Sequence, residues 1–397
     1  MKAHSLLFAC LLLFACSGNP ETDEVEKKEE GVITIDVANA KNYNGTLDPL
    51  IEDVYFLELE TSEEALFTQV SKVIFAEGKM FILDIMSEKV LAFDNDGKFL
   101  FTVSKKGLGP GEYQGVSSIA YDYDKNQLIL AASGKLLWFD AFGKFIREEK
   151  SDIRTYIGDM AYLGNSQFAV YMDMSGNFGE EAVRAIVIDD KAKRVASYQP
   201  FSTDTRTENT TAMNSHFSSS QEPLAVGTYS HEVWKFNSKG AGIAYRFDFG
   251  EDAMPDDFLD TYITDPSLTS AMVRDIIADK GYWALYGSAV QEVGQNMFFT
   301  YSNRKEYRNG FFDKKTGKGL TFQSQISNDA GDKGSLIAVG SYNEYLVTPY
   351  RSKFLSGFLD SDQLSEDQKK AIELIGKEDI PLLWFVKFKN LDEIEVD

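Results

Sequence analysis

The segment DYDKNQ, residues 122–127, begins with carboxylates at the alternate positions that a calcium-binding loop uses. Such a loop also needs a glycine at its sixth position and a bidentate glutamate at its twelfth. Gln127 and Ser133 stand at those two positions, so the pattern fails as a calcium site. We interpret the segment as a polar turn between two strands. Calcium is therefore unsupported, and neither a metal site nor another cofactor is predicted.

Basic and aromatic residues gather in two further segments, YSNRKEYRNG (301–310) and TPYRSKF (348–354). Aromatic rings stack on sugars, and guanidinium groups bind carboxylates through paired hydrogen bonds. One interpretation is therefore a surface that binds a sugar or a carboxylate. The alternative is an ordinary set of exposed hairpin residues. The candidate ligand-binding residues in these segments are Arg304, Tyr307, Arg308, Tyr350 and Arg351.

The rest of the chain contains no pattern for a known catalytic mechanism. It has no Gly-x-Ser-x-Gly nucleophile elbow, no phosphate-binding P-loop and no dinucleotide-binding glycine fingerprint. His216 and His231 alone cannot build a zinc site without carboxylate help. The two cysteines, Cys10 and Cys16, both lie near the N-terminus, so the remainder has no disulfide and no thiolate metal site. No catalytic residue is predicted.

The bulk composition favours a folded, strand-rich and acidic protein. Of the 397 residues, 43% are hydrophobic and 13% aromatic, which is enough for a large core. Phe and Tyr are abundant while Pro is scarce, which favours strands. The formal net charge is -22 at pH 7. A surplus of this size repels phosphate backbones, so we expect no binding to nucleic acid.

A turn motif recurs along the chain. In FDNDGKF, residues 93–99, residues that tolerate left-handed backbone separate two short strands. The spacings between successive turns are 46, 49, 48, 76 and 76 residues, so three steps are regular and two are long. The aligned polar residues of the six turns are Asp94, Asp140, Asp189, Asn237, Asp313 and Lys389.

Both long steps contain a stretch with helical features, at about 255–281 and about 361–379. In the first stretch, Asp265 and Pro266 suit an N-cap and a first helical position. Without these two inserts, both long steps return to the regular period. Three apolar residues of the first stretch share one helix face, namely Leu268, Met272 and Ile276.

Within each unit the sequence predicts four short strands. The second strand is nearly all apolar, as expected when both of its faces are buried between neighbouring sheets. Four strands in a unit of this length are typical of a β-propeller blade, and six turns predict six blades. The strand at 31–37 is expected to close the ring beside 381–388, so that no edge remains bare. In the first unit the strands are predicted at 70–76, 80–85, 89–94 and 98–104.

The N-terminus resembles a bacterial lipoprotein export sequence. Lys2 precedes an apolar stretch at 6–15 that is too short to span a membrane. The tetrapeptide LFAC then ends at Cys16, the position that such lipoproteins acylate. The resemblance implies removal of residues 1–15 and a lipid on Cys16, followed by a flexible polar tether at 16–30. Cleavage without lipidation is the alternative.

The most distinctive motif is KKGLGPGEYQGV, residues 105–116. It resembles the GxGPGEY signature of a family of six-bladed β-propeller lipoproteins of Bacteroidota, which are related to NHL-type propellers. The resemblance implies an all-β propeller over 31–397, with six four-stranded blades and two short helical insertions. It implies no activity. Tyr113 of the motif is either a packing residue or part of a ligand-facing mouth.

The expected function is that of an outer-membrane lipoprotein in the cell envelope, either periplasmic or surface-exposed. Its lipid would contact the membrane, and its propeller would bind a glycan, a peptide or an envelope protein. We favour a protein that is not an enzyme. The alternative is a hydrolase, lyase or lactonase that acts on a glycan-derived substrate in the central funnel. A third alternative is a structural role in which the helical inserts dock on a neighbouring protein.

Overall fold

The structure is a computed structural model. The chain divides into two units, Met1–Gly31 and Val32–Asp397, and all that follows concerns the second unit. Cys16 and the second helical insert lie outside the described residues. The structure describes residues 31–394 except 45–46, 133, 152, 154–156, 173–182, 201–216, 228, 256, 259–266, 286–289, 324, 328–332 and 352–380.

The recurring turn is built in the same way in successive sheets. The Oδ1 atom of Asp94 accepts hydrogen bonds from the backbone N–H groups two and four residues further on, at 3.0 and 2.8 Å. Asp140 and Asp189 cap their turns with the same pattern. Gly97 has a φ of +81°, and a Cβ there would lie 2.0 Å from the carbonyl oxygen of Glu58, so only glycine fits. Each turn leads from the third strand of a blade toward the fourth, as the repeat predicts.

The first three blades are sheets of four consecutive strands, each paired antiparallel to the next. The first blade contains β4 (Lys72–Ala76), β5 (Lys79–Asp84), β6 (Lys89–Asp94) and β7 (Phe99–Val103). The second contains β8 (Val116–Asp122), β9 (Gln127–Ala132), β10 (Lys135–Asp140) and β11 (Phe145–Lys150). The third contains β12 (Ile157–Gly164), β13 (Gln167–Met172), β14 (Val183–Ile188) and β15 (Arg194–Pro200). The strands of the first blade begin and end within two residues of their predicted bounds.

The remaining three blades are less regular. The fourth contains β16 (Leu224–Val226), β17 (Glu232–Asn237) and β18 (Gly240–Asp248), with a bridge from Phe217 to Ala225 on the inner side. In the fifth, β19 (Ala284–Leu285) and β20 (Gln291–Val293) both pair with β21 (Asn296–Ser302), which precedes β22 (Tyr307–Asp313) and β23 (Gly319–Gln323). The sixth contains β26 (Gly340–Tyr342), β27 (Tyr345–Arg351) and β28 (Pro381–Phe388). A separate two-stranded ribbon consists of β24 (Gln325–Ser327) and β25 (Lys333–Ser335).

Three N-terminal strands complete these blades. β1 (Ile33–Asp36) pairs in parallel with β18, β2 (Lys41–Tyr43) in parallel with β23, and β3 (Ile51–Glu58) antiparallel with β28. The predicted closure of the ring by residues 31–37 is therefore wrong, because β3 closes it. The eight-residue β3 matches the length of β28, and its Tyr55 ring stacks on Phe385 at a centroid distance of 4.4 Å. The four residues of β1 are too few for that pairing.

Each pair of neighbouring blades encloses one apolar cluster. In β5, Phe81 packs toward the second blade and Ile82 toward the sixth, so this strand is buried on both faces, as predicted. Trp138 packs between the second and third blades, and Trp384 between the fifth and sixth. Leu383 joins the cluster between the sixth and first blades, which confirms that the ring is closed. These six shared clusters hold the propeller together.

The first helical insert contains α2 (Ser270–Lys280). The predicted N-cap at Asp265 is wrong for this helix, because Thr269 caps it by accepting the Met272 N–H on its Oγ1 at 3.3 Å. Val273 and Ile277 are its buried residues. Of the predicted apolar face, Leu268 and Ile276 pack against the same cluster, whereas Met272 is 46% exposed. The short 3-10 helices are η1 (Asp48–Leu50), η2 (Gly250–Asp252) and η4 (Leu391–Glu393).

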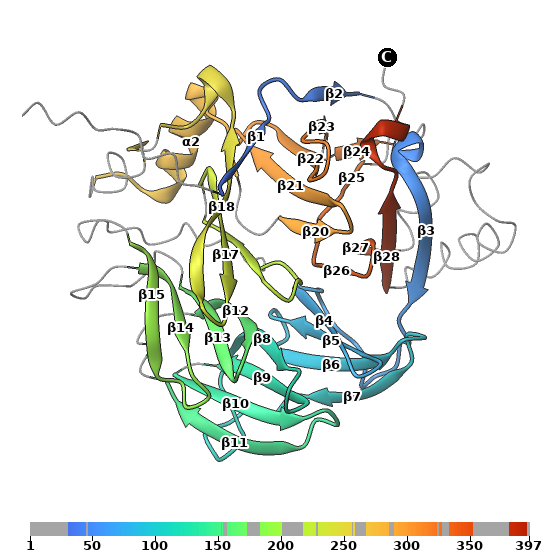
Figure 1. Cartoon of the computed structure of the whole chain (residues 1–397). Helices are drawn as coiled ribbons and strands as arrows, with labels where there is room; N and C mark the ends of the chain where they lie inside the picture. The colour runs from blue at the N-terminus through green and yellow to red at the C-terminus, as the bar shows by residue number, and fades with distance from the viewer. Residues whose placement is uncertain are drawn as a thin grey trace, which may run out of the picture. The chain divides into compact units, whose positions relative to one another are not determined.

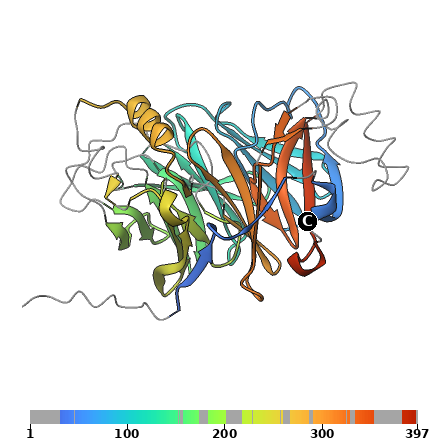
Figure 2. The same cartoon turned by 90° about the horizontal axis from the view of Figure 1, so that it is seen from above.

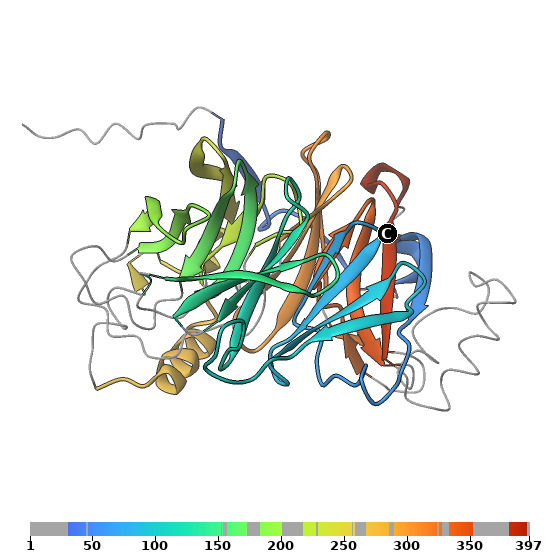
Figure 3. The same ribbon diagram turned by 90° about the horizontal axis from the view of Figure 1, so that it is seen from below.

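The strand order divides the connections between two faces of the propeller. Connections from first to second and from third to fourth strand lie at one face, which we call the turn face because it carries the capped turns at Asp94, Asp140 and Asp189. Connections from second to third strand and from blade to blade lie at the other face, the loop face, with the glycine-rich motif and α2. Figure 1 shows the six sheets following one another around a common axis. In Figures 2 and 3, α2 lies on the side opposite the short hairpin turns.

Candidate functional site

The innermost strands of the first four blades meet at a buried ion pair. Lys72 Nζ on β4 lies 2.6 Å from Asp159 Oδ1 on β12 and also donates to the carbonyl oxygen of Met160 at 2.7 Å. Ser118 Oγ on β8 donates to the same Asp159 oxygen at 2.6 Å. The N–H of Phe217 donates to Asp159 Oδ2 at 2.8 Å. One carboxylate therefore connects side chains or backbone from four blades.

This ion pair is suited to bracing the ring rather than to acid–base chemistry. Burial alone would raise the pKa of Asp159, but the Lys72 ammonium and the hydrogen bonds from Ser118 and Phe217 outweigh it and hold the pKa below its usual value. Asp159 is 1% exposed and Lys72 is 8% exposed. A buried charge pair whose donors and acceptors are matched holds its surroundings in one arrangement.

The fifth and sixth blades complete the centre of the ring. Gln291 Oε1 accepts the Ser219 N–H at 3.1 Å, and a Cβ at Gly340 would lie 2.9 Å from Ser219 Oγ. The inner strands are thus closely packed at this level. Sequence reasoning missed these polar residues at the centre of the ring, although their spacing within the repeat could have indicated them. Lys72, Ser118 and Gln291 each stand 22 residues before the capped turn residue of their own blade.

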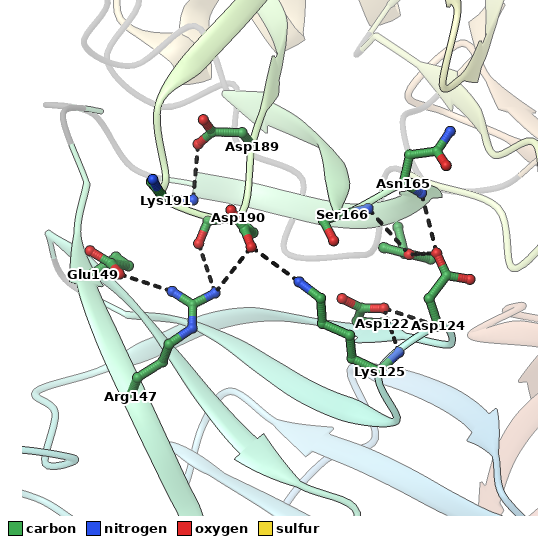
Figure 4. Close-up of polar contacts among 11 residues, drawn as sticks. Asp122, Asp124, Lys125, Arg147, Glu149, Asn165, Ser166, Asp189, Asp190 and Lys191 are labelled. Atoms are coloured by element: carbon green, nitrogen blue, oxygen red, sulfur yellow. Dashed lines mark hydrogen bonds and ion pairs between the residues drawn. The ribbon is translucent and has the colours of Figure 1, made fainter.

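A polar cluster joins the second and third blades on the turn face (Figure 4). Asp122 is 1% exposed, and its Oδ1 atom accepts the N–H groups of Asp124 and Lys125, both at 3.0 Å. Asp124 accepts hydrogen bonds from the Tyr162 hydroxyl and from the Asn165 N–H. The two carboxylates of the calcium-like segment thus cap turns, which confirms the polar turn predicted there. Within the described ranges, no three His, Cys, Asp or Glu side chains group as metal ligands.

Two cations of the same cluster reach across from the second blade to Asp190 of the third (Figure 4). Lys125 Nζ lies 3.0 Å from Asp190 Oδ2, and Arg147 donates to the carbonyl oxygen of Asp190 at 2.7 Å. The Arg147 guanidinium lies 3.7 Å from the Trp138 ring centroid and pairs with Glu149 at 3.0 Å. Exposed ion pairs of this kind contribute about 0–1 kcal/mol each. We interpret the cluster as a set of polar contacts that stabilises the interface between the second and third blades.

The glycine-rich motif folds into a rigid loop between the first and second blades. Glu112 accepts the Gly109 N–H at 2.9 Å, and a Cβ at Gly107 would lie 2.0 Å from the Glu112 carboxylate. Tyr113 is 1% exposed, and its hydroxyl lies 3.0 Å from the carbonyl oxygen of Val103. Burial raises the pKa of Tyr113. These contacts favour the packing alternative for Tyr113 over a ligand-facing mouth.

The same loop presents an apolar side chain to solvent. Leu108, at its tip, is 82% exposed. Two other large apolar residues of the first blade's loop face are also exposed, namely Leu66 at 54% and Met86 at 59%. We call Leu66, Met86 and Leu108 the loop patch. Sequence reasoning singled out the motif but not this consequence of it, because solvent exposure depends on how three separate connections pack.

Polar contacts tie the three connections of the loop patch together. Lys106, two residues before Leu108, has its Nζ 2.8 Å from Glu88 Oε2 in the connection that carries Met86. Thr68 Oγ1, in the connection that carries Leu66, lies 2.9 Å from Ser87 Oγ. The three apolar side chains therefore stand on connections that are fixed to one another.

Two of the candidate ligand-binding residues lie together in the hairpin between β21 and β22. Arg304 adopts a φ of +71°, and its guanidinium carbon lies 6.0 Å from the Tyr307 ring centroid. Tyr307 is 38% exposed. Lys305 Nζ lies 4.0 Å from Asp279 Oδ1 on α2, so the hairpin and the helix adjoin on the loop face. This pair, Arg304 and Tyr307, is the hairpin patch.

Arg308 and Tyr350, two further candidates from the basic and aromatic segments, have partners outside this hairpin. Arg308 donates to Asn42 Oδ1 on β2, at the outer edge of the fifth blade. Tyr350 of β27 lies 5.5 Å from Trp384, centroid to centroid, and burial raises its pKa. The side chain of Arg351 lies outside the described residues. The structure thus brings Arg304 and Tyr307 together in one hairpin, whereas Tyr350 lies on β27 of the sixth blade.

The fold and the closed centre define the class of protein, an all-β propeller with six blades. Over residues 32–387 the chain matches the family model described as a domain of unknown function, DUF4934, and the chain belongs to that family. No curated protein shows significant sequence similarity to it. The structure confirms the six-bladed fold that the sequence resemblance implied.

Two solved structures are similar to this chain. A Bacteroides fragilis protein described as a "putative exported protein" aligns with a TM-score of 0.72 and 18% identity, over 90% of this chain and 100% of that chain. A DUF4221 family member from Bacteroides vulgatus aligns with a TM-score of 0.48 and 10% identity, over 86% and 97% of the two chains. In the part of the chain that the structure describes, no helix is long and apolar enough to cross a membrane.

Proposed function

We propose that this chain is a binding protein of the cell envelope that performs no catalysis. Export would remove residues 1–15, a lipid on Cys16 would anchor the chain in the outer membrane, and residues 16–30 would be its tether. The propeller would then present its loop face to a partner on the periplasmic or outer side. The Bacteroides fragilis protein of the same fold, described as a "putative exported protein", supports this location.

The loop patch is the single observation that carries the proposal. Large apolar side chains scattered singly over a surface are ordinary. Leu66, Met86 and Leu108 differ because they are 54%, 59% and 82% exposed on three connections that hydrogen bonds and an ion pair hold together. A partner that covers these side chains removes their apolar surface from water, so such a surface favours association.

The surroundings of the loop patch indicate the chemistry of the partner. Lys105 and Lys106 precede Leu108 and are exposed, Lys106 pairs with Glu88, and Glu63 and Glu64 are exposed close to Leu66 in the sequence. An envelope protein that offers apolar side chains within a rim of both charges would match this surface. The hairpin patch, on the same face, would add an aromatic ring and a guanidinium for a peptide or glycan. Arg308, Tyr350 and Arg351 remain candidates for ligand binding.

A propeller enzyme that works on a glycan-derived substrate in a central funnel has less support. Among the described residues, the charged side chains at the centre of the ring contact one another, and Asp159 is 1% exposed. An acid or base that serves a substrate must reach it within hydrogen-bond distance.

The test compares partner capture by matched variants. The purified chain would be screened by thermal shift against glycans and peptides, and used to capture proteins from envelope extracts. We expect the double substitution Met86→Ser and Leu108→Ser to abolish the capture of a partner that the unaltered chain retains. Serine keeps the charge unchanged, so the loss would report on apolar contact alone.

Phe142→Ser is the matched control. Phe142 is 75% exposed, comparable to Leu108, but it lies on the turn face. The control variant should capture the partner as well as the unaltered chain does. Equal capture by all three proteins would contradict the assignment of the loop patch, and the absence of any ligand or partner in both screens would contradict the proposed function.

A further inference from the structure

A small cavity lies on the turn face, between the fifth and sixth blades, away from the loop patch. Its volume is about 160 Å³. Part of its wall is aromatic, since Phe311 and Phe388 line it with their ring centroids 4.1 Å apart. A cavity of roughly 150 Å³ accommodates a ligand the size of benzene, so this one can take a short aliphatic side chain.

The charged part of the wall carries a surplus of acid. Lys387 Nζ lies 2.9 Å from Glu52 Oε1 and 3.1 Å from Glu344 Oε2. Two carboxylates therefore face one ammonium group. Each ionised carboxylate offers about four acceptor sites and gives only part of them to Lys387. The side chains of Glu52 and Glu344 are 43% and 63% exposed, so both remain accessible to a ligand.

A buried amide adds a second, independent sign of a ligand. Asn296 lines the cavity and is only 7% exposed. Its side-chain oxygen has no hydrogen-bond partner among the residues that the structure describes. Buried polar atoms in folded proteins nearly always have a hydrogen-bond partner. A buried polar atom without one costs free energy. An incoming N–H donor would supply that partner.

We propose that this cavity binds the lysine side chain of a peptide. An ammonium group has donors and no acceptor, which matches an oxygen-lined wall with one uncompensated negative charge. The four methylene groups of lysine would pack on Phe311 and Phe388, and the ring faces attract a nearby cation. The site lies on the face opposite the loop patch, so the inference stands independently of the proposed function.

The experiment compares two amino-acid derivatives of nearly equal shape by isothermal titration calorimetry. Nα-acetyl-lysine methylamide carries the ammonium group, and Nα-acetyl-norleucine methylamide replaces it with an apolar end. We expect the lysine derivative to bind at least about tenfold more tightly, because a charge-assisted hydrogen bond is worth that ratio. Added salt should weaken its binding, since the exposed carboxylates are screened.

The substitution Glu344→Gln should weaken binding of the lysine derivative by about tenfold or more. Glu222→Gln is the matched control, because Glu222 lies in the corresponding turn of the fourth blade, is 51% exposed and pairs with Lys235 at 2.8 Å. That variant should bind as the unaltered chain does. Equal affinity for both derivatives, no binding of either, or an unchanged affinity in Glu344→Gln would each overturn the proposal. Binding of n-butylammonium without binding of the lysine derivative would contradict the proposal that the ligand is part of a peptide.

Discussion

The centre of the ring and the loop patch use their residues in opposite ways. At the centre, residue types that often carry chemistry, namely Lys72, Ser118 and Asp159, contact one another and are buried. On the loop face, plain apolar side chains such as Met86 and Leu108 stand in solvent. The charged groups are satisfied within the chain, whereas the apolar groups are available to another molecule.

This contrast teaches that residue type alone is a poor guide to function in a propeller. Six inner strands converge on one axis, so polar side chains there find partners from neighbouring blades and become structural. Connections on the loop face differ from blade to blade, and each can expose side chains that the repeat does not constrain. Four predictions test the contrast, in order of decreasing expected effect.

The largest effect is expected from Asp159→Ala. It would leave the Lys72 ammonium buried without its carboxylate, which typically costs about 3–5 kcal/mol of unfolding free energy. Chemical denaturation would measure the loss. Asp190→Ala is the control, since it removes an exposed ion pair with Lys125 and should cost only about 0–1 kcal/mol. Similar losses in both variants would remove the distinction between the centre and the surface.

Acid should weaken the centre of the ring. The folded-state pKa of Asp159 lies below its ordinary value of 3.8, so its ion pair stabilises the fold fully above about pH 4. That contribution is lost as the pH falls through the lower, folded-state pKa. The difference in unfolding free energy between the unaltered chain and Asp159→Asn should therefore shrink when the pH is lowered below about 4. A difference that stays constant over that range would contradict the buried ion pair.

A smaller effect is expected from Gly107→Ala in the glycine-rich motif. The new Cβ would lie 2.0 Å from the Glu112 carboxylate and would displace it from the Gly109 N–H, a loss of about 0.5–1.5 kcal/mol. Thermal unfolding would measure it, and faster proteolysis at the loop should accompany it. Gly134→Ala is the control, because Gly134 also has a positive φ but no atom within 4 Å of the added Cβ. An equal or larger loss in the control would show that Glu112 does not hold the loop.

The smallest effect on stability is expected from Met86→Ser with Leu108→Ser. Both side chains are more than half exposed, so the unfolding free energy should change by no more than about 0.5 kcal/mol. The same variant is expected to lose partner capture, which separates binding from folding. A destabilisation comparable to that of Asp159→Ala would mean that the loop patch serves the fold.

Much of the fold could be predicted because local physics repeats along the chain. Asp94, Asp140 and Asp189 each cap a tight turn with their own side chain, so the turn is readable from a few residues. The apolar second strand of each blade follows from burial on both faces, as Phe81 and Ile82 show. Neither inference needs knowledge of distant contacts.

The errors arose where distant segments compete for the same partner. β1 and β3 are both extended N-terminal segments, and only the available edges of β18 and β28 decide which strand closes the ring. The apolar face of α2 is another case, since packing against distant residues buries Val273 and Ile277 and leaves Met272 exposed. The candidate ligand residues Arg304 and Tyr350 could not be grouped or separated from sequence, because they lie in different blades.

The sequence by itself determined the sixfold repeat, the strand-rich character and the turn chemistry, because each depends on residues within a few positions of one another. Tertiary structure alone decided that Lys72 and Asp159 meet at the centre, that Leu66, Met86 and Leu108 are exposed on linked connections of the loop face, and that a cavity forms beside Lys387. These features depend on the closure of the ring, which brings together residues far apart in the chain and sets which side chains water can reach.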